Sequence, residues 1–233
     1  MKLRELLAGV PICAGSADLE MEISGVSYDS RTTRPGDLFV AMTGFATDGH
    51  QYIAKALANG AAAVLCQRRP AEACAYVQTE DSRRALAVIG GNWFGHPAEE
   101  MTMIAVTGTC GKTTTTYLLK AILEQARGVK VGLIGTNQNM IGSDVIPTER
   151  TTPESFEVQK LFREMADAGC THVVMETSSH ALYLDRVYGV RYDVGIFTNL
   201  TQDHLDFHKT MENYCDAKAI LFRNCVTGVV NAD

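Results

Sequence analysis

The segment Met103 to Thr116, MIAVTGTCGKTTTT, constrains the fold more than any other part of this 233-residue sequence. A short apolar run leads into a turn that carries Gly108, Gly111 and Lys112, and four threonines follow. This pattern predicts a strand, a glycine loop and the start of an amphipathic helix. Glycines let backbone N–H groups converge on an anion, while a helix N-terminus and a lysine add positive charge. The segment therefore predicts a phosphate-binding loop.

The loop is shorter than the common pattern G-x-x-x-x-G-K-[ST]. Position 106, where that pattern has its first glycine, is Val106, so the cradle begins at Gly108. Thr113, directly after the lysine, can ligate the Mg²⁺ that accompanies a nucleoside triphosphate. The alternative is an ordinary strand-to-helix turn with a solvated lysine, which two glycines and the GKT run disfavour. At Cys110 we expect the loop to use the backbone and not the side chain.

Composition excludes several classes of protein. The sequence is 46% apolar and 21% charged, as in globular proteins with a real core. Its formal net charge of −6 does not indicate nucleic-acid binding, which favours a basic surface. No window approaches the roughly 18 apolar residues of a membrane span, and the N-terminus lacks a secretory apolar region. Seven cysteines without C-x-x-C spacing indicate neither disulfides nor a zinc site. We expect a cytoplasmic monomer without nucleic-acid or membrane partners.

The residues before the phosphate loop predict a separate small mixed α/β domain, 1–98. Apolar runs and turn signals predict strands at 23–28, 38–42, 61–66 and 76–77, and helices at 3–7, from 51 to about 60, and at 82–93. Ser82 is the expected N-cap of the last helix. Gly95, His96 and Pro97 are expected to end this helix. We therefore place the domain boundary just after them.

The second domain, 99–233, alternates strands and helices, which predicts a mostly parallel sheet covered by helices. Strands are expected at 103–106, 130–134, 171–176, 193–198 and 228–231, with a polar loop around 137–142. One helix is expected to end near Gly128, another to start with Thr152 as its N-cap, and a third to span 211–223. Because the sequence stops just after a strand, we expect this domain to be truncated.

Polar segments follow three of these strands, at 108–114, 176–180 and 199–206, and ligands of open α/β sheets bind beyond such carboxyl ends. Glu176 could hold Mg²⁺ directly or through water; the alternative is a capping or surface carboxylate. His204 and His208 have a spacing that zinc sites use, but no third ligand is apparent. We prefer a single imidazole near Mg²⁺ and phosphate for His204, and a satisfied or surface histidine for His208. His180 follows two serines without a nucleophile elbow, which excludes serine catalysis.

Five motifs, in order, resemble those of the Mur ligases: GTCGKTTTT, ERTTPE, METSSHAL, TNLTQDHLDFH and AKAILF. Within that family the sequence is most similar to the MurE type, which adds the third amino acid of the peptidoglycan stem peptide. The segments VSYDSR and PGDLFVAMTGFATDGH also resemble that family's UDP-binding domain. The resemblance covers almost the whole chain.

The resemblance implies an ATP-dependent ligase that forms a carbon–nitrogen bond. ATP would phosphorylate the D-glutamate carboxylate of UDP-MurNAc-L-Ala-D-Glu, and the amine of L-lysine or meso-diaminopimelate would displace the phosphate. The family's C-terminal amino-acid-binding domain is absent here, so we expect that these 233 residues alone cannot complete the reaction.

Matching the motifs residue by residue assigns roles by resemblance. The implied catalytic residues are Lys112, Lys218 and His204, where Lys218, on composition alone a solvated helix lysine, would be carbamylated by CO₂. Mg²⁺ would be held by Thr113, Glu176, His204 and carbamylated Lys218. ATP would bind to Gly108, Thr109, Cys110, Gly111, Lys112, Thr113 and Thr114. The UDP part of the substrate would bind to Tyr28, Ser30, Phe45, Ala46 and Thr47. Its muramyl dipeptide would bind to Thr151, Thr152, Ser178 and Arg186, and Arg150 would also bind the substrate.

Two positions depart from the family pattern. Phe45-Ala46-Thr47 stands where some members have His-Gln-Ala, and Leu184 stands where glutamine is common. Two other functions stay open. One is a nucleotide- or UDP-sugar-binding module without turnover, which would need no carbamate on Lys218. The other is a related ligase such as a folylpolyglutamate synthase, which would lack the UDP domain that the N-terminal segments indicate.

Overall fold

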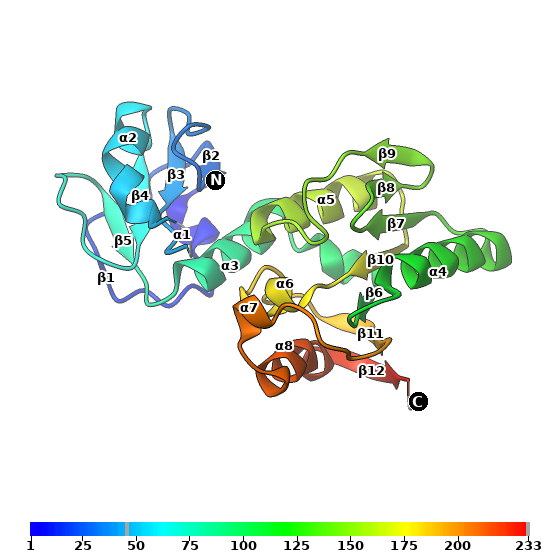
Figure 1. Cartoon of the computed structure of the whole chain (residues 1–233). Helices are drawn as coiled ribbons and strands as arrows, with labels where there is room; N and C mark the ends of the chain where they lie inside the picture. Colours follow the sequence, from blue (N-terminus) through cyan, green and yellow to red (C-terminus); the bar gives the residue numbers. More distant parts are fainter. Residues whose placement is uncertain (45–46, 232–233) are drawn as a thin grey trace. The chain divides into compact units, whose positions relative to one another are not determined.

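The computed structural model describes residues 1–44 and 47–231, and these divide into two compact units, one up to residue 93 and one from residue 94 on. The division falls between Trp93 and Phe94, near the end of helix α3 (Ser82–Phe94), whereas the sequence predicts a domain boundary between 98 and 99. Figure 1 shows a sheet with covering helices in each unit. The expected α/β class is confirmed, with a smaller sheet followed by a larger, mostly parallel one.

The first unit contains a five-stranded sheet of order β1-β5-β4-β3-β2, in which only β1 runs antiparallel to its neighbour within the described residues. Its elements are α1 (Leu3–Leu6), β1 (Ala14–Gly15), β2 (Gly25–Ser27), β3 (Asp37–Val40), the 3₁₀ helix η1 (Gly49–Tyr52), α2 (Ile53–Ala58), β4 (Ala63–Cys66), β5 (Tyr76–Gln78) and α3. All of β3 and β4 is buried, as their continuous apolar runs predict. Phe39 and Val64 pack against Ile53 of α2.

The start of α3 differs from the prediction. Asp81 Oδ1 accepts hydrogen bonds from the backbone N–H groups of Arg83 (2.9 Å) and Arg84 (3.1 Å), so Asp81 caps the helix. Ser82 is the first helical residue, and its buried hydroxyl donates to Gln67 Oε1 at 2.9 Å. The expected Ser82 cap is therefore wrong, because the preceding carboxylate takes that role.

The second unit contains a seven-stranded sheet of order β12-β11-β6-β10-β7-β8-β9. Its strands are β6 (Thr102–Thr107), β7 (Val131–Ile134), β8 (Asn139–Ile141), β9 (Asp144–Ile146), β10 (His172–Glu176), β11 (Tyr192–Phe197) and β12 (Cys225–Val230). The five strands from β12 to β7 are parallel, as predicted, and β8 and β9 form an antiparallel hairpin. The expected loop at 137–142 is wrong, because residues 139–141 pair with β7.

Helices cover both faces of this sheet (Figure 1). They are η2 (Pro97–Glu100), α4 (Lys112–Arg127), α5 (Ser155–Asp167), α6 (Ser179–Tyr183), α7 (Leu205–His208) and α8 (Met211–Arg223). Ile104 and Val174 pack on the face covered by α4, whereas Met103 and Val173 pack with α5, α6 and α8 on the other. The alternation along β6 and β10 thus buries both faces of the central strands.

The predicted helix 211–223 and the helix end at Gly128 are confirmed. The predicted start of α5, with Thr152 as its N-cap, is wrong. Glu154 is the N-cap, and the helix begins at Ser155. Thr152 instead donates its hydroxyl hydrogen to the carbonyl of Glu176 at 2.9 Å and accepts one from the N–H of Ser178 at 3.2 Å. It therefore ties this segment to the end of β10. In the described part of the chain, no helix is long and apolar enough to cross a bilayer.

Candidate phosphate-binding site

The glycine loop leaves the carboxyl end of β6 in a conformation that needs glycine. Gly108 has φ +145° and Gly111, the N-cap of α4, has φ +85°. A Cβ at position 108 would lie 1.9 Å from Thr198 Oγ1 and 3.1 Å from the backbone nitrogen of Asn199. The loop therefore lies directly against the segment that follows β11.

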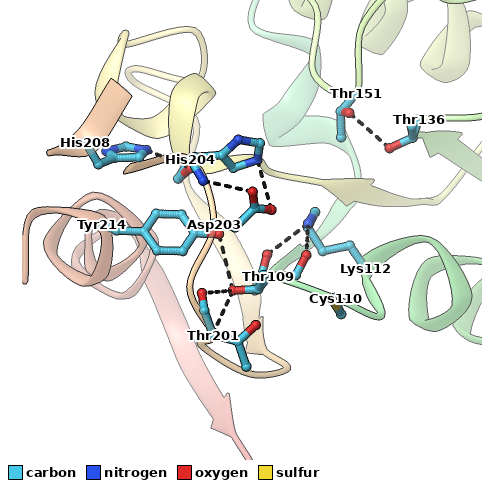
Figure 2. A network of polar contacts seen from close by, with 12 residues as sticks. Thr109, Cys110, Lys112, Thr136, Thr151, Thr201, Asp203, His204, His208 and Tyr214 are labelled. Carbon is cyan, nitrogen blue, oxygen red and sulfur yellow. Dashed lines mark hydrogen bonds and ion pairs between the residues drawn. The ribbon is translucent and has the colours of Figure 1, made fainter. Parts of the chain in front are cut away.

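Side chains after β11 brace the loop. Cys110 donates its N–H to Asn199 Oδ1 at 2.9 Å, and its carbonyl accepts from Thr198 Oγ1 at 2.6 Å. Thr109 Oγ1 lies 3.2 Å from the Tyr214 hydroxyl, and it accepts from the N–H of Thr201 at 3.0 Å, as Figure 2 shows. The loop uses the backbone of Cys110, as expected. The segment 199–206 was expected at this end of the sheet, and Asn199 and Thr201 do contact the loop. The contacts of Thr198 and Tyr214 with the loop were not predicted.

Two lysines share one carbonyl of the loop. Lys112 Nζ donates to the carbonyls of Gly108 (2.8 Å) and Thr109 (2.9 Å), and Lys218 Nζ donates to that of Gly108 at 2.9 Å. Lys218 is only 2% exposed, and its Nζ lies 4.3 Å from the centre of the Tyr214 ring. The composition-based interpretation of Lys218 as a solvated lysine is therefore wrong. Burial lowers the pKa of Lys112, while burial and the neighbouring Lys112 charge lower the pKa of Lys218 to about 7.

This lowered pKa makes the stability of the unit depend on pH. Between pH 7 and the ordinary lysine value of 10.5, the unfolded chain holds a proton on Lys218 that the folded chain releases, so the contribution of Lys218 to stability increases as pH rises. We expect Lys218→Met to raise the free energy of unfolding at pH 6.5, by on the order of 2 kcal/mol, and the gain to shrink towards pH 10. Urea unfolding across this range tests it, with exposed Lys160→Met as control; a gain that is constant with pH would contradict it.

Glu176 ends β10 as a fully buried carboxylate beside the phosphate loop. Its Oε2 accepts from Thr113 Oγ1 (3.0 Å) and Thr136 Oγ1 (3.0 Å), and its Oε1 accepts from the N–H of Thr136 (2.9 Å). The alternative of a surface carboxylate is wrong. Thr136 follows β7 and was not predicted; its position after the neighbouring parallel strand was the available signal. Thr114 is exposed in the first turn of α4.

The histidines form a cluster of rings. His204 has a left-handed backbone, φ 53°, and its ring centre lies 4.8 Å from that of His180. His208 is buried, its Nε2 lies 2.9 Å from Ser179 Oγ, and burial lowers the pKa of His208 to about 4, so its ring is neutral at physiological pH. Within residues 1–44 and 47–231, no three His, Cys, Asp or Glu side chains form a metal-binding group by themselves. A metal ion here would need further oxygen ligands, such as those of a nucleotide.

The predicted dipeptide-binding residues also gather beyond β10. Thr151 Oγ1 lies 3.0 Å from Thr136 Oγ1 (Figure 2). Arg186 donates from Nη1 to the carbonyl of Thr152 at 3.2 Å and pairs through Nε with Glu154 at 3.0 Å. Arg150 pairs with the same carboxylate at 3.0 Å, and Ser178 caps α6 by accepting from the N–H of Ala181. Threonine side chains therefore connect this segment to Glu176, and both arginines pair with Glu154.

The first unit has a hollow of about 460 Å³ that contains the other predicted binding residues. Tyr28, Ser30 and Thr47 line it, and Phe45 and Ala46 lie outside the described residues. Two basic side chains that the sequence did not indicate, Lys55 and Arg83, also line it. Arg31 of the segment VSYDSR lines it as well and pairs with Asp29, another lining residue, at 2.5 Å. A hollow of this size and charge suits a nucleotide-sized anion.

A parallel α/β sheet with a short phosphate loop and a buried carboxylate on the adjacent strand defines a phosphate-loop domain of the kind that uses nucleotides. The profile "Mur ligase middle domain" matches residues 106–233, more than half of the chain, and "Mur ligase family, catalytic domain" matches residues 22–93. The chain belongs to the Mur ligase family.

Relatives of this chain are named UDP-N-acetylmuramoyl-L-alanyl-D-glutamate–2,6-diaminopimelate ligases. One from Clostridium botulinum is 52% identical over 91% of this chain and 45% of its own length, and one from Clostridium tetani is 47% identical over 100% and 49%. A solved structure with the same name superposes with a TM-score of 0.84 at 29% identity, over 100% of this chain and 47% of the other. The chain thus spans about half the length of the relatives it matches.

Proposed function

We propose that this chain provides the UDP-sugar-binding and ATP-binding parts of a ligase of peptidoglycan precursor synthesis. ATP would phosphorylate the D-glutamate carboxylate of UDP-MurNAc-L-Ala-D-Glu, and the amine of an amino acid would then displace phosphate to form the amide. One observation carries this proposal. The hydrogen bonds of Glu176 join the phosphate loop, through Thr113, to Thr136 and the segment around Thr151. A phosphate on the loop and a carboxylate held by that segment would therefore be neighbours.

The residues at the loop fit ATP with Mg²⁺. The carboxylate of Glu176 and the hydroxyls of Thr113 and Thr136 are hard oxygen donors, the type that Mg²⁺ prefers. Mg²⁺, when bound, would neutralise charge on the transferred phosphate. Lys112 would turn from the loop carbonyls to the ATP phosphates, and the N–H groups of residues 108 to 114 would complete the cradle. The family resemblance implies a supporting role for His204 at a second Mg²⁺.

Glu176→Gln tests the metal role directly. The amide keeps the shape of the side chain and loses its charge, so we expect ATP to bind with nearly the same affinity in the absence of Mg²⁺. The increase in affinity that Mg²⁺ produces should fall by about tenfold. Calorimetric titration of ATP with and without Mg²⁺ measures both values. Glu72→Gln, a change at an exposed glutamate of the first unit, should behave as wild type; an unchanged Mg²⁺ effect in Glu176→Gln would exclude this role.

Lys218 has the environment that carbamylation requires. A neutral amine adds to CO₂ and releases one proton, which leaves a carbamate anion on Nζ. Because the pKa of Lys218 is about 7, a large fraction of its amine is neutral at physiological pH. The carbamate would replace a buried cation beside Lys112 by an anion that can pair with it or with Mg²⁺. These features support the carbamate that the family resemblance implies.

The UDP part of the substrate is assigned to the hollow of the first unit. Tyr28, Ser30 and Thr47 would contact the nucleotide, and the basic groups Lys55 and Arg83 would face its diphosphate. The dipeptide is assigned to Arg150, Thr151, Thr152, Ser178 and Arg186. Phe45 and Ala46 keep the role that the resemblance implies.

Lys55→Ala is expected to weaken UDP binding about tenfold, because one charge-assisted contact to phosphate is lost. Lys55 belongs to α2, whose packing depends on Ile53 and Ala56, so the fold should be retained. Fluorescence or calorimetric titration with UDP measures the affinity. Exposed Arg69→Ala removes the same charge elsewhere in the unit and should leave the affinity unchanged; equal affinities of the two variants would contradict the assignment.

The relatives' names favour meso-diaminopimelate over L-lysine as the amino acid that is added. Cytoplasmic location is part of the proposal, because the nucleotide-linked substrate and ATP are cytoplasmic molecules. The monomeric state stays a prediction. A folylpolyglutamate synthase is disfavoured, since the ligases named above match the first unit as well as the second.

The alternative is a binding module that holds ATP or the UDP-sugar without turnover. The buried Lys218 favours the ligase, because nucleotide binding alone does not need a lysine of lowered pKa inside the site. Calorimetry on the 233-residue chain tests the shared requirement. We expect separate binding of Mg²⁺-ATP and UDP-MurNAc-L-Ala-D-Glu. Absence of either interaction would exclude the ligase, and absence of both would also exclude the binding module.

A further inference from the structure

A second hollow lies at the opposite end of the larger sheet from the phosphate loop. It has a volume of about 310 Å³ and is formed by η2, the middle of α5 and the turn that leads into β11. Met101, just before β6, and Val190, just before β11, belong to its wall. The phosphate loop starts at the other end of β6, a strand of six residues that spans about 20 Å. The two sites are therefore separate.

The wall contains a buried polar group without a partner. Gln159 of α5 is only 7% exposed, and its Oε1 is buried without a hydrogen-bond partner in the described residues. Leaving such an acceptor unpaired costs about 1–3 kcal/mol. The last torsion of a glutamine side chain is broad, so a small rotation would turn this carboxamide towards a donor in the hollow. A ligand that brings an N–H group would satisfy it.

Charged side chains of both signs surround the hollow. Glu99, Arg191 and Asp193 line it and are exposed. Asp193 accepts the N–H of Met103 at 2.7 Å, and within the described chain none of the three forms an ion pair. By contrast, neighbouring Glu100 pairs with Arg163 at 2.6 Å. The hollow thus offers carboxylates for an ammonium group and a guanidinium for a carboxylate.

We propose that this hollow binds a small zwitterion of the amino-acid type. The ammonium group would contact the carboxylates of Glu99 or Asp193 and the carbonyl oxygen of Gln159, and the ligand's carboxylate would contact Arg191. The buried side chains of Met101 and Val190, 7% and 4% exposed, would pack against its methylene groups. The volume is at the lower end of the range for ligand pockets, which suits an amino acid better than a nucleotide. This proposal does not depend on the proposed ligase function.

Calorimetry on the 233-residue chain with four probes tests the charge requirement. L-Lysine and L-glutamate carry both groups, cadaverine lacks the carboxylate, and glutarate lacks the ammonium group. The titrations are repeated with saturating Mg²⁺-ATP, which should leave the result unchanged. We expect at least one amino acid to bind at least tenfold more tightly than its matched analogue. Equal binding within both pairs, lysine with cadaverine and glutamate with glutarate, or no binding of any probe, would overturn the proposal.

Variants and a local signal place the binding in this hollow. Gln159→Leu keeps the side-chain size and removes the unpaired carboxamide, so the chain should stay folded, and Arg191→Gln changes an exposed side chain. Each should weaken binding about tenfold, whereas Arg127→Gln, at the exposed end of α4, should not. The ¹³C-methyl resonance of Met101, assigned with Met101→Leu, should shift on binding, and that of Met1 should not. Unchanged affinity in both variants, or no shift at Met101, would overturn the proposal.

Discussion

Gly108→Ala is expected to abolish measurable ATP binding and to lower the free energy of unfolding by about 2–4 kcal/mol. The new Cβ would lie 1.9 Å from Thr198 Oγ1, in a backbone conformation, φ +145°, that non-glycine residues rarely adopt. Relief of the clash must move either the loop or the segment after β11, and both hold the cradle in place. ATP calorimetry and urea unfolding of the same preparation measure the two effects.

Gly128→Ala is the matched control for this prediction. Gly128 also has a positive φ, +64°, but a Cβ there would meet no atom within 4 Å. Gly128→Ala should therefore lower the free energy of unfolding by only about 1 kcal/mol, as expected for a non-glycine residue in this conformation. It should leave the ATP affinity unchanged. Normal ATP binding by Gly108→Ala would show that the loop does not need close contact with Thr198.

Lys112→Met is expected to weaken ATP binding about a hundredfold, because the lysine would contact two phosphates of the bound nucleotide. Its stability should be little changed or higher, since burial already lowers the pKa of Lys112 and thus disfavours its charge. Calorimetry with Mg²⁺-ATP and thermal unfolding measure both quantities.

Cys110→Ala in the same loop separates side-chain from backbone effects. The loop uses the N–H and carbonyl of Cys110, so this variant should bind ATP with an affinity within about twofold of wild type. A large loss of ATP affinity in Cys110→Ala, or wild-type ATP affinity in Lys112→Met, would show that the loop does not bind phosphate through its backbone and Lys112.

Elements with a strong local pattern could be predicted from the sequence. The parallel strands around β6 are continuous apolar runs, and α8 has regular apolar spacing over its whole length. Some short or polar elements were missed. The hairpin of β8 and β9 lies in a segment rich in asparagine and glycine, and α6 has only five residues. Such elements form because neighbouring strands and helices hold them, which a local pattern does not show.

Some residues of the candidate site could likewise be predicted from the sequence, and others could not. The glycine loop and Glu176 could be predicted, because the position after a parallel strand determines where a side chain lies. The burial of Lys218 could not, since it depends on the carbonyl of Gly108, 110 residues earlier in the chain. The same holds for Thr136 and for the unpaired Gln159, whose surroundings come from several distant segments.

Ligation by a completed enzyme tests the central proposal most directly. The chain would be fused to the part of the Clostridium botulinum relative that it does not cover, with the whole relative as positive control. With Mg²⁺-ATP and UDP-MurNAc-L-Ala-D-Glu present, we predict that adding meso-diaminopimelate releases one phosphate for each amide formed, and that Lys218→Ala in the fusion abolishes this release. A folded fusion that binds both substrates but releases no phosphate with diaminopimelate or lysine would contradict the account.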